Sequence, residues 1–479
     1  MDIVTPDPGR YSLKQGSSKN ITNRCGIVVI ILLIIGIFIS PPSNVSWAAS
    51  NSSNEPLSKT SETLLTPAKP WYEKIETEWN GRLRLLGSVS WHDEDTIFDS
   101  VESGPYYDGN ADFRLMNNTY LNQHTYFTIH YEANYSGGDT LRVFNELATQ
   151  FPELLENGLI IGSPVSDDRR VFDLTHIIHE DSNSVLYHRL DRLSLTWKPR
   201  WGVVRIGRQA VTWGNGFLFN PFDLFNPFAP TDIIRDYKTG DDMLNVQLLE
   251  NQIGDLQFLY VARRNPENNE VEFCQSSLAG KWRFAWGTTE FDVMAAEHFE
   301  DEIIGLGSSG YLRDAAWRLD ATWTFLQDDD ERDGFLSLAA NMDYAWVWWR
   351  RNIYGFVEFY FNGLGNEDYS EAITNPAIIT RINRGEIYTL GRKYLATGIQ
   401  IELHPLFRVF LNSINNLADP SGILQPYAEW DLTQNLQLAF GGTAYYGGSK
   451  TEYGGFTISG TDFIFQRPYA AFLWLTYYF

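Results

Sequence analysis

The sequence predicts an all-β chain that closes into a barrel of about 18 antiparallel strands, and three observations lead to this prediction. Segments of about ten to fourteen residues alternate between apolar and polar side chains. Short and long connections alternate along the chain, and aromatic residues, which make up 15% of it, gather at the predicted strand ends. Together these features are typical of a strand-built membrane protein and not of a helical one, since the mean hydropathy is −0.27.

The alternation is clearest between residues 315 and 325. Every odd position there is apolar, while Arg318 and Asp320 lie on the opposite face. Residues 122–135, 335–349 and 391–404 repeat the pattern. Strands of soluble sandwiches commonly have ~5–6 residues, whereas a tilted strand needs ~9–11 residues to cross a bilayer. The length of these segments therefore favours a transmembrane barrel.

The predicted strands begin near residues 81, 122, 139, 185, 201, 241, 254, 274, 288, 302, 313, 335, 351, 391, 405, 423, 435 and 468. The weakest are 139–147, which would also suit a helix, and the glycine-rich 302–311; without both, the barrel would have sixteen strands. Short turns between them are expected on the periplasmic side and long loops outside. An even number of strands places both ends of the barrel at the periplasmic side.

Residues 1–48 have the pattern of an export signal. Basic residues in 1–25 precede the apolar run 27–39, and a small-residue site follows at Ala48. An uncleaved anchor is the alternative, but the run is shorter than the ~20 residues of a spanning helix. Residues 49–75 are then a flexible lead-in, and 76–479 form the predicted barrel.

The last strand carries the most specific signal. Leu473, Leu475, Tyr477 and Phe479 lie on one face, and Phe479 is the final residue. This pattern resembles the C-terminal strand of Gram-negative outer-membrane β-barrel proteins. The resemblance implies a bacterial outer membrane location, contact with outer-membrane lipid, and recognition of Phe479 by the barrel-assembly machinery. The architecture is porin-like, without a match to a specific porin family, and it is also similar in size to alginate-export barrels.

Residues 213–240 form the candidate functional element. They follow the fifth predicted strand and are therefore the third external loop, which in porins commonly folds into the lumen. Three prolines exclude a ladder strand, and a free loop with so many phenylalanines would expose a large apolar patch. The aromatic residues expected to fix the loop are Trp213, Phe217, Phe219, Phe222, Phe225 and Phe228. The alternatives are a lid over the mouth and a contact with another subunit of a homo-oligomer.

Charged residues in and beside this loop are the candidate selectivity elements. The predicted pore constriction comprises Arg205, Arg208, Asp223, Asp232, Arg235, Asp236, Lys238, Asp241 and Asp242. Arg205 and Arg208 fall on opposite faces of an ideal strand, so one of them must lie at an end, at a bulge or on a wall covered by loops. Arg318, Asp320, Glu358, Glu402 and Arg408 are predicted to face the lumen, where opposed charges create a transverse field or simply pair across strands.

Composition excludes several other functions. A net charge of −23 leaves no basic face for nucleic acid. No nucleophile elbow, phosphate loop or zinc-ligand set is present, so neither an enzyme nor a cofactor is predicted. His176 and His179, three residues apart on an expected helix, are too few for a metal site.

Three functions stay open on the sequence. The leading prediction is a passive channel for small hydrophilic solutes. The alternatives are an exporter of an anionic polysaccharide or other polymer, and a structural barrel with a closed lumen.

Overall fold

The computed structural model describes residues 75–151, 166–232, 237–250, 254–327 and 332–479, all within the compact unit Thr60–Phe479. The predicted signal peptide and almost all of the lead-in lie outside the described residues, as do Arg235 and Asp236. Within the described residues no helix is long and apolar enough to cross a membrane.

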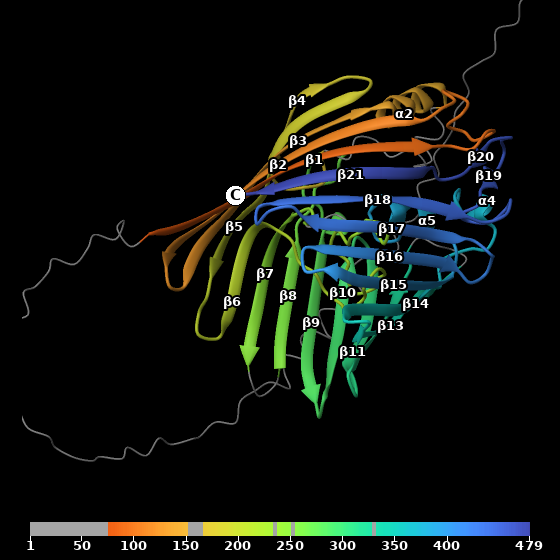
Figure 1. Cartoon of the computed structure of the whole chain (residues 1–479). Helices are drawn as coiled ribbons and strands as arrows, with labels where there is room; N and C mark the ends of the chain where they lie inside the picture. The colour runs from red at the N-terminus through yellow and green to blue at the C-terminus, as the bar shows by residue number, and fades with distance from the viewer. Residues whose placement is uncertain (1–74, 152–165, 233–236, 251–253, 328–331) are drawn as a thin grey trace, which may run out of the picture. The chain divides into compact units, whose positions relative to one another are not determined.

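Eighteen strands form a closed antiparallel ring, because the last strand pairs with the first (Figure 1). The sheet has 19 strands, of which β4 (Thr175–Glu180) pairs with β5 alone, and 19 − 1 leaves 18. The ring consists of β1 (Glu76–Trp91), β2 (Tyr106–Asn122), β3 (Thr125–Gly138), β5 (Ser184–Trp197), β6 (Gly202–Gln209), β7 (Asp241–Glu250), β8 (Gly254–Val261), β9 (Ser277–Trp286), β10 (Thr289–His298), β11 (Asp301–Leu312), β12 (Ala315–Phe325), β13 (Gly334–Trp348), β14 (Arg351–Asn362), β15 (Lys393–His404), β16 (Phe407–Asn416), β17 (Gly422–Asp431), β18 (Leu436–Tyr446) and β21 (Tyr469–Tyr478).

The predicted number of strands is confirmed, but two of the assignments behind it are wrong and cancel. Residues 139–147 belong to helix α2 (Asp139–Gln150), which buries Val143 and Leu147. The strand that the prediction lacks is β2. Its outward positions mix Phe113 and Leu115 with Gly109, Ala111, Asn117 and Thr119, which interrupts the apolar alternation. The doubtful segment 302–311 is part of β11. The predicted strand 139–147 is absent and the unpredicted β2 is present, and both lie before β5 in the chain. Strand β6 is therefore still the fifth strand of the ring, as predicted.

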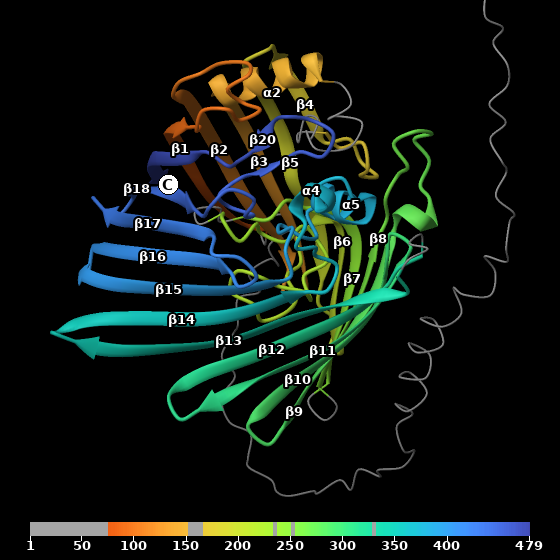
Figure 2. The same ribbon diagram turned by 90° about the vertical axis from the view of Figure 1, so that its right-hand side faces the viewer.

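The connections between strands differ at the two ends of the barrel. We call these the short-turn end and the long-loop end. Two-residue turns join β2 to β3, β9 to β10, β11 to β12, β13 to β14 and β15 to β16. The opposite end carries α2, β4, the η3 turn (Phe273–Gln275), helices α4 (Tyr369–Ala372) and α5 (Pro376–Asn383), and the small hairpin β19 (Phe456–Thr457) and β20 (Ile464–Phe465). Figure 2 shows α2, α4 and α5 gathered at this end. His176 and His179 lie on strand β4 and not on a helix.

The outer face of the ring is apolar and its inner face carries charged residues, as a bilayer requires. Outward positions carry exposed apolar side chains, such as Leu306 at 66% and Leu473 at 53% exposure. Trp286 and Trp349 stand at the short-turn end, where interfacial aromatic residues belong. Inward positions include buried charges such as Arg114, Asp320 and Glu358. A closed sheet leaves no unpaired edge in lipid, so the protein is a transmembrane β-barrel of the bacterial outer membrane.

The final residue helps to close the ring. The Phe479 backbone exchanges hydrogen bonds of 2.8 and 3.0 Å with Gly81, and its ring stacks on Phe113. A Cβ added at Gly81 would lie 2.3 Å from the Phe479 ring, whereas one at Gly87 would meet nothing within 4 Å. Glycine at position 81 therefore makes room for the terminal aromatic ring.

This contact predicts that Gly81→Val destabilises the barrel while Gly87→Val, on the same strand, does not. The valine must displace the Phe479 ring and weaken the seam at which β1 meets β21. Thermal unfolding in detergent, followed by circular dichroism, should show a lower midpoint for Gly81→Val alone. Equal midpoints for the two variants would contradict this role of the terminal residue.

Candidate functional site

The candidate site is the segment that joins β6 to β7, residues 210–240, of which 210–232 and 237–240 are described. It contains little regular secondary structure. Pro221, Pro227 and Pro230 remove backbone donors, so the segment satisfies much of its backbone through side chains of the wall. Those side chains fix its position.

Glu358 of β14 makes the most concentrated of these contacts. Its carboxylate accepts hydrogen bonds from the backbone N–H groups of Phe217 (2.6 Å), Leu218 (2.9 Å) and Phe219 (2.8 Å). The Asn341 amide of β13 donates a fourth bond of 3.1 Å. Glu358 is fully buried, and charged acceptors make the stronger class of protein hydrogen bonds. The carboxylate therefore holds three consecutive residues of the segment against the wall.

The neighbouring Asn215 is held in the same way. Its backbone N–H donates to Asp320 of β12 at 2.6 Å, and its carbonyl accepts from the Asn341 amide at 3.1 Å. Gly214 just before it has φ +83°, a conformation that glycine adopts without strain. Asn215 and Asn341 were not among the residues predicted from the sequence, because amides give no signal of a long-range contact.

Aromatic side chains of the segment fill two apolar clusters. Trp213, Phe222 and Phe225 pack with inward residues of β7–β11, including Met243, Leu259, Val261, Met294 and Ile303. Phe219 stacks on Tyr360 with ring centroids 4.3 Å apart. Phe217 stacks on Phe356 at 4.9 Å, yet 37% of its surface is exposed. Phe228 is half-buried and belongs to neither cluster.

Other contacts reach the remaining sides of the ring. The Thr231 carbonyl accepts from Gln425 of β17 at 3.0 Å. The Lys238 carbonyl accepts from Arg192 of β5. Tyr237 lies 4.9 Å from the guanidinium of Arg82 on β1 and 4.5 Å from that of Arg114 on β2. The segment thus contacts strands spaced around the whole ring.

Most of the charges predicted for a pore constriction are buried in ion pairs. Lys238 Nζ lies 2.7 Å from both carboxylate oxygens of Asp223 and donates to the Val211 carbonyl. Burial raises the pKa of Asp223 to about 6 and lowers the pKa of Lys238. Both shifts have one cause, because burial disfavours the charged forms and the mutual contact offsets only part of that cost.

A second buried group lies where the segment joins β6 and β7. Arg208 is 2% exposed and binds both Asp242 and Asp167 at 2.9 Å. Burial alone would raise the pKa of Asp167, but hydrogen bonds from Arg170 and Arg208 hold it at about 2. Asp241 pairs with Arg263 at 3.1 Å. The 166–174 stretch covers Arg208, which explains how it and Arg205 occupy opposite faces of β6.

Arg205 lies elsewhere, in a polar cavity of 340 Å³ against β2, β3, β5 and β6. It donates to Thr196 at 3.0 Å. Arg192 and Lys198 also line this cavity, and no carboxylate does. Asp232 is half-buried.

Of the five predicted lumen residues, Asp320 and Glu358 hold the segment, and the other three bind polar partners on the wall. Arg318 lies 2.6 Å from Asp343, and Arg408 lies 2.9 Å from Glu429. Glu402 accepts from Asn352 at 3.3 Å. These contacts leave the side chains of both ion pairs between 16% and 35% exposed.

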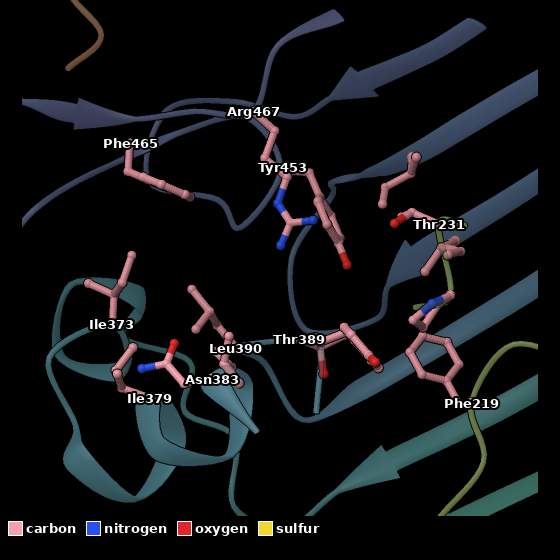
Figure 3. Close-up of a pocket in the computed structure, with 15 residues that line it drawn as sticks. Phe219, Thr231, Ile373, Ile379, Asn383, Thr389, Leu390, Tyr453, Phe465 and Arg467 are labelled. Atoms are coloured by element: carbon pink, nitrogen blue, oxygen red, sulfur yellow. The ribbon is translucent and has the colours of Figure 1, made fainter. Parts of the chain in front are cut away.

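A second cavity, of 170 Å³, lies between the segment and the loops of the long-loop end (Figure 3). Phe219 and Thr231 of the segment line it, together with Ile379, Tyr453 and Arg467. Most of its lining side chains are apolar. The cavity therefore separates part of the segment from the outer loops by an apolar space.

The structure also assembles a serine, a histidine and an acid that the sequence did not suggest. Ser277 Oγ lies 2.8 Å from His298 Nδ1, and His298 Nε2 lies 3.4 Å from Glu386. Both Ser277 and His298 are 2% exposed, and the Ser277 hydroxyl also accepts from Arg263 at 2.6 Å. Because a substrate has no access to this hydroxyl, the group is a structural link between β9, β10 and the loop before β15. Among the described residues, no three side chains are placed to hold a metal ion.

Comparisons with known proteins find similar solved structures at low sequence identity. No family model and no curated protein matches the chain. Solved structures similar to it include OccAB2 of Acinetobacter baumannii (9% identity, TM-score 0.47, 84% of this chain and 98% of the other). OccK9 of Pseudomonas aeruginosa is similar at 8% identity and a TM-score of 0.48, over 85% of this chain and 99% of the other. A BenF-like porin of Pseudomonas fluorescens is similar at 10% identity and a TM-score of 0.45, over 84% of this chain and 98% of the other. At such identities no residue of this chain takes a role from these proteins.

The contacts of Glu358 predict that Glu358→Gln loosens the segment. The glutamine nitrogen cannot accept a hydrogen bond, so at least one buried backbone donor loses its partner at a cost of about 1–3 kcal/mol. Amide hydrogen exchange of residues 213–220 should accelerate. Glu402→Gln, a control on the neighbouring strand β15, should leave exchange unchanged, and equal exchange in both variants would refute the proposed restraint.

Proposed function

We propose that the protein is a passive outer-membrane channel for small hydrophilic solutes, and that the 210–240 segment folds into the barrel and narrows it. One observation carries this proposal. The segment contacts β1, β2, β5, β8, β12, β13, β14 and β17 through their side chains. A single connection contacts strands on all sides of a closed ring only if it crosses the interior.

The depth of the contacts favours a constriction over a lid. Glu358, Asn341 and Asp320 lie in the interiors of β14, β13 and β12, several residues from the long-loop end. A lid would instead contact the loops, as Pro227 does through the Tyr388 hydroxyl. The apolar packing of Phe222 and Phe225 also requires an inner wall that is apolar locally, which β7–β11 provide.

The charges of the segment then divide into two roles. Arg208, Asp223, Lys238, Asp241 and Asp242 are buried, so we assign them to holding the segment and its ends. Arg205, with Arg192 and Lys198, lines a polar cavity and is the candidate for contact with a solute. In a low-dielectric wall, accessible charges have the larger effect on passing ions.

The pairing of basic residues argues against a polyanion exporter. Arg114 pairs with Glu132 and Asp191, and Arg189 pairs with Glu132. Arg82 pairs with Asp112 in the same region. A path for an anionic polymer needs a continuous surface of positive potential, which these acids interrupt. A crossing segment also leaves less room for a polymer than for a small solute.

The proposal predicts that the barrel conducts, and that replacing residues 217–232 with a short Gly-Ser linker raises its single-channel conductance. Removing the crossing segment widens the narrowest part of the path. Planar bilayer recordings of the purified full chain test this. A control that removes residues 266–270 from an exposed loop should leave conductance unchanged. A barrel without current, before and after the replacement, would refute the channel.

A further inference from the structure

Inward positions of the wall carry an aromatic surface near the short-turn side of the segment. Its six members are Phe217 of the segment, Phe356 of β14, Phe410 of β16, Tyr427 of β17, and Phe472 and Trp474 of β21. All are partly exposed. Barrel interiors are polar by default, so an exposed aromatic surface on the inner face requires a reason. We call this set the aromatic belt.

Strand alternation places the belt on the face that the segment contacts. Phe356 lies two residues from Glu358, and Tyr427 lies two residues from Gln425, both of which bind the segment. Phe410 is directly paired with Tyr427, Tyr427 with Gly441, and Gly441 with Phe472. Only a glycine, which has no side chain, separates the rings of this row.

Four of the six rings form two stacked pairs, while Phe472 and Trp474 meet edge to face with centroids 6.1 Å apart. Phe410 and Tyr427 are parallel within 1°, with centroids 4.4 Å apart, and Phe217 and Phe356 are 4.9 Å apart at 27°. A Cβ added at Gly398 would lie 2.1 Å from the Phe356 ring, so that ring lies over the backbone of β15. Two strand spacings separate the pairs, which corresponds to roughly 10 Å.

Each stacked pair is bordered by an ion pair that a solute can reach. Arg408 and Glu429 are paired directly, two residues from Phe410 and Tyr427. Asp343 is paired with Phe356, and its partner Arg318 lies 4.9 Å above the Phe217 ring. Each border therefore offers both donors and acceptors without a net charge.

We propose that the aromatic belt binds neutral saccharides, and that its two stacked pairs are two subsites for one oligosaccharide; this rests on the proposed channel function. A pyranose ring has an apolar face of C–H groups, which packs on an aromatic ring. Its hydroxyl groups both donate and accept hydrogen bonds, as the bordering ion pairs do. A spacing of roughly 10 Å requires a chain of more than one sugar to contact both pairs.

The alternative ligand is an aromatic anion, which also stacks on rings and guanidinium groups. It is disfavoured because Arg408 and Arg318 are already neutralised by Glu429 and Asp343. An anion would have to displace those carboxylates or remain unpaired beside them, and either outcome costs free energy.

Planar bilayer recordings of the full chain with maltotriose, glucose and benzoate test the proposal. Maltotriose should reduce the salt current saturably and at a lower concentration than glucose. Phe410→Ala should raise the half-blocking concentration of maltotriose about tenfold through loss of one stacked pair, and Phe410→Trp should restore it. Phe440→Ala, on the lipid-facing side of β18, should behave as the unmodified chain does. The salt current of each variant without sugar reports that it has folded and inserted.

Two results would overturn the saccharide site and leave the channel in place. One is a normal salt current that maltotriose does not change; the other is block by benzoate at a lower concentration than by maltotriose. A chain without current refutes the channel instead, and the intrinsic tryptophan fluorescence in detergent, titrated with maltotriose and compared with that of Trp474→Phe, then decides the binding site separately. A saturable change that Phe410→Ala weakens supports the site, and no change refutes it.

Discussion

The position of the 210–240 segment depends on one buried carboxylate. Glu358 is fully buried, and an ionised group in that position is stable only with several strong donors. The backbone N–H groups of Phe217, Leu218 and Phe219 supply three of them. The dependence is mutual, because these three N–H groups would otherwise be unsatisfied inside the barrel. These bonds, together with the one that the Asn215 N–H donates to Asp320, attach the β6–β7 segment to the part of the wall that lies across the ring from β6 and β7.

Different parts of the inner wall surround the 210–240 segment, and they differ in polarity. The wall of β7–β11 is apolar where Phe222 and Phe225 pack, so the segment is attached there by burial of surface. The side of β2, β3, β5 and β6 is polar and holds Arg205 in an open cavity. The aromatic belt lies between β14 and β21 and is neither filled by the segment nor fully polar. In the proposed channel, a solute that passes the segment would therefore meet two chemically different walls.

Alternation with period two, loop length and the terminal Phe479 were sufficient to predict the barrel, because each is a pattern local in the sequence. The number of 18 strands was reached only because one strand too many and one too few cancelled. Strand β2 was missed because Gly109, Ala111, Asn117 and Thr119 share its outward positions with Phe113 and Leu115, so its apolar alternation is interrupted. Helix α2 begins directly at the end of β3, without a break in the chain. Within the site, the residues Asp223 and Lys238 were predicted as candidates, but their mutual burial depends on how the segment folds. The contact of Glu358 with residues about 140 positions earlier in the chain leaves no local pattern at all.

The most direct test of the account is a cross-link between the segment and the middle of β13. Cysteines replace Asn215 and Asn341, whose backbone and side chain are joined by a hydrogen bond of 3.1 Å, in a chain that also carries Cys274→Ser. A short bis-maleimide is added to the folded barrel in membranes, and the product is digested between the two positions. A segment that crosses the barrel predicts that the two fragments remain joined. Fragments that separate, although each cysteine reacts with the reagent singly, would show that the segment lies elsewhere.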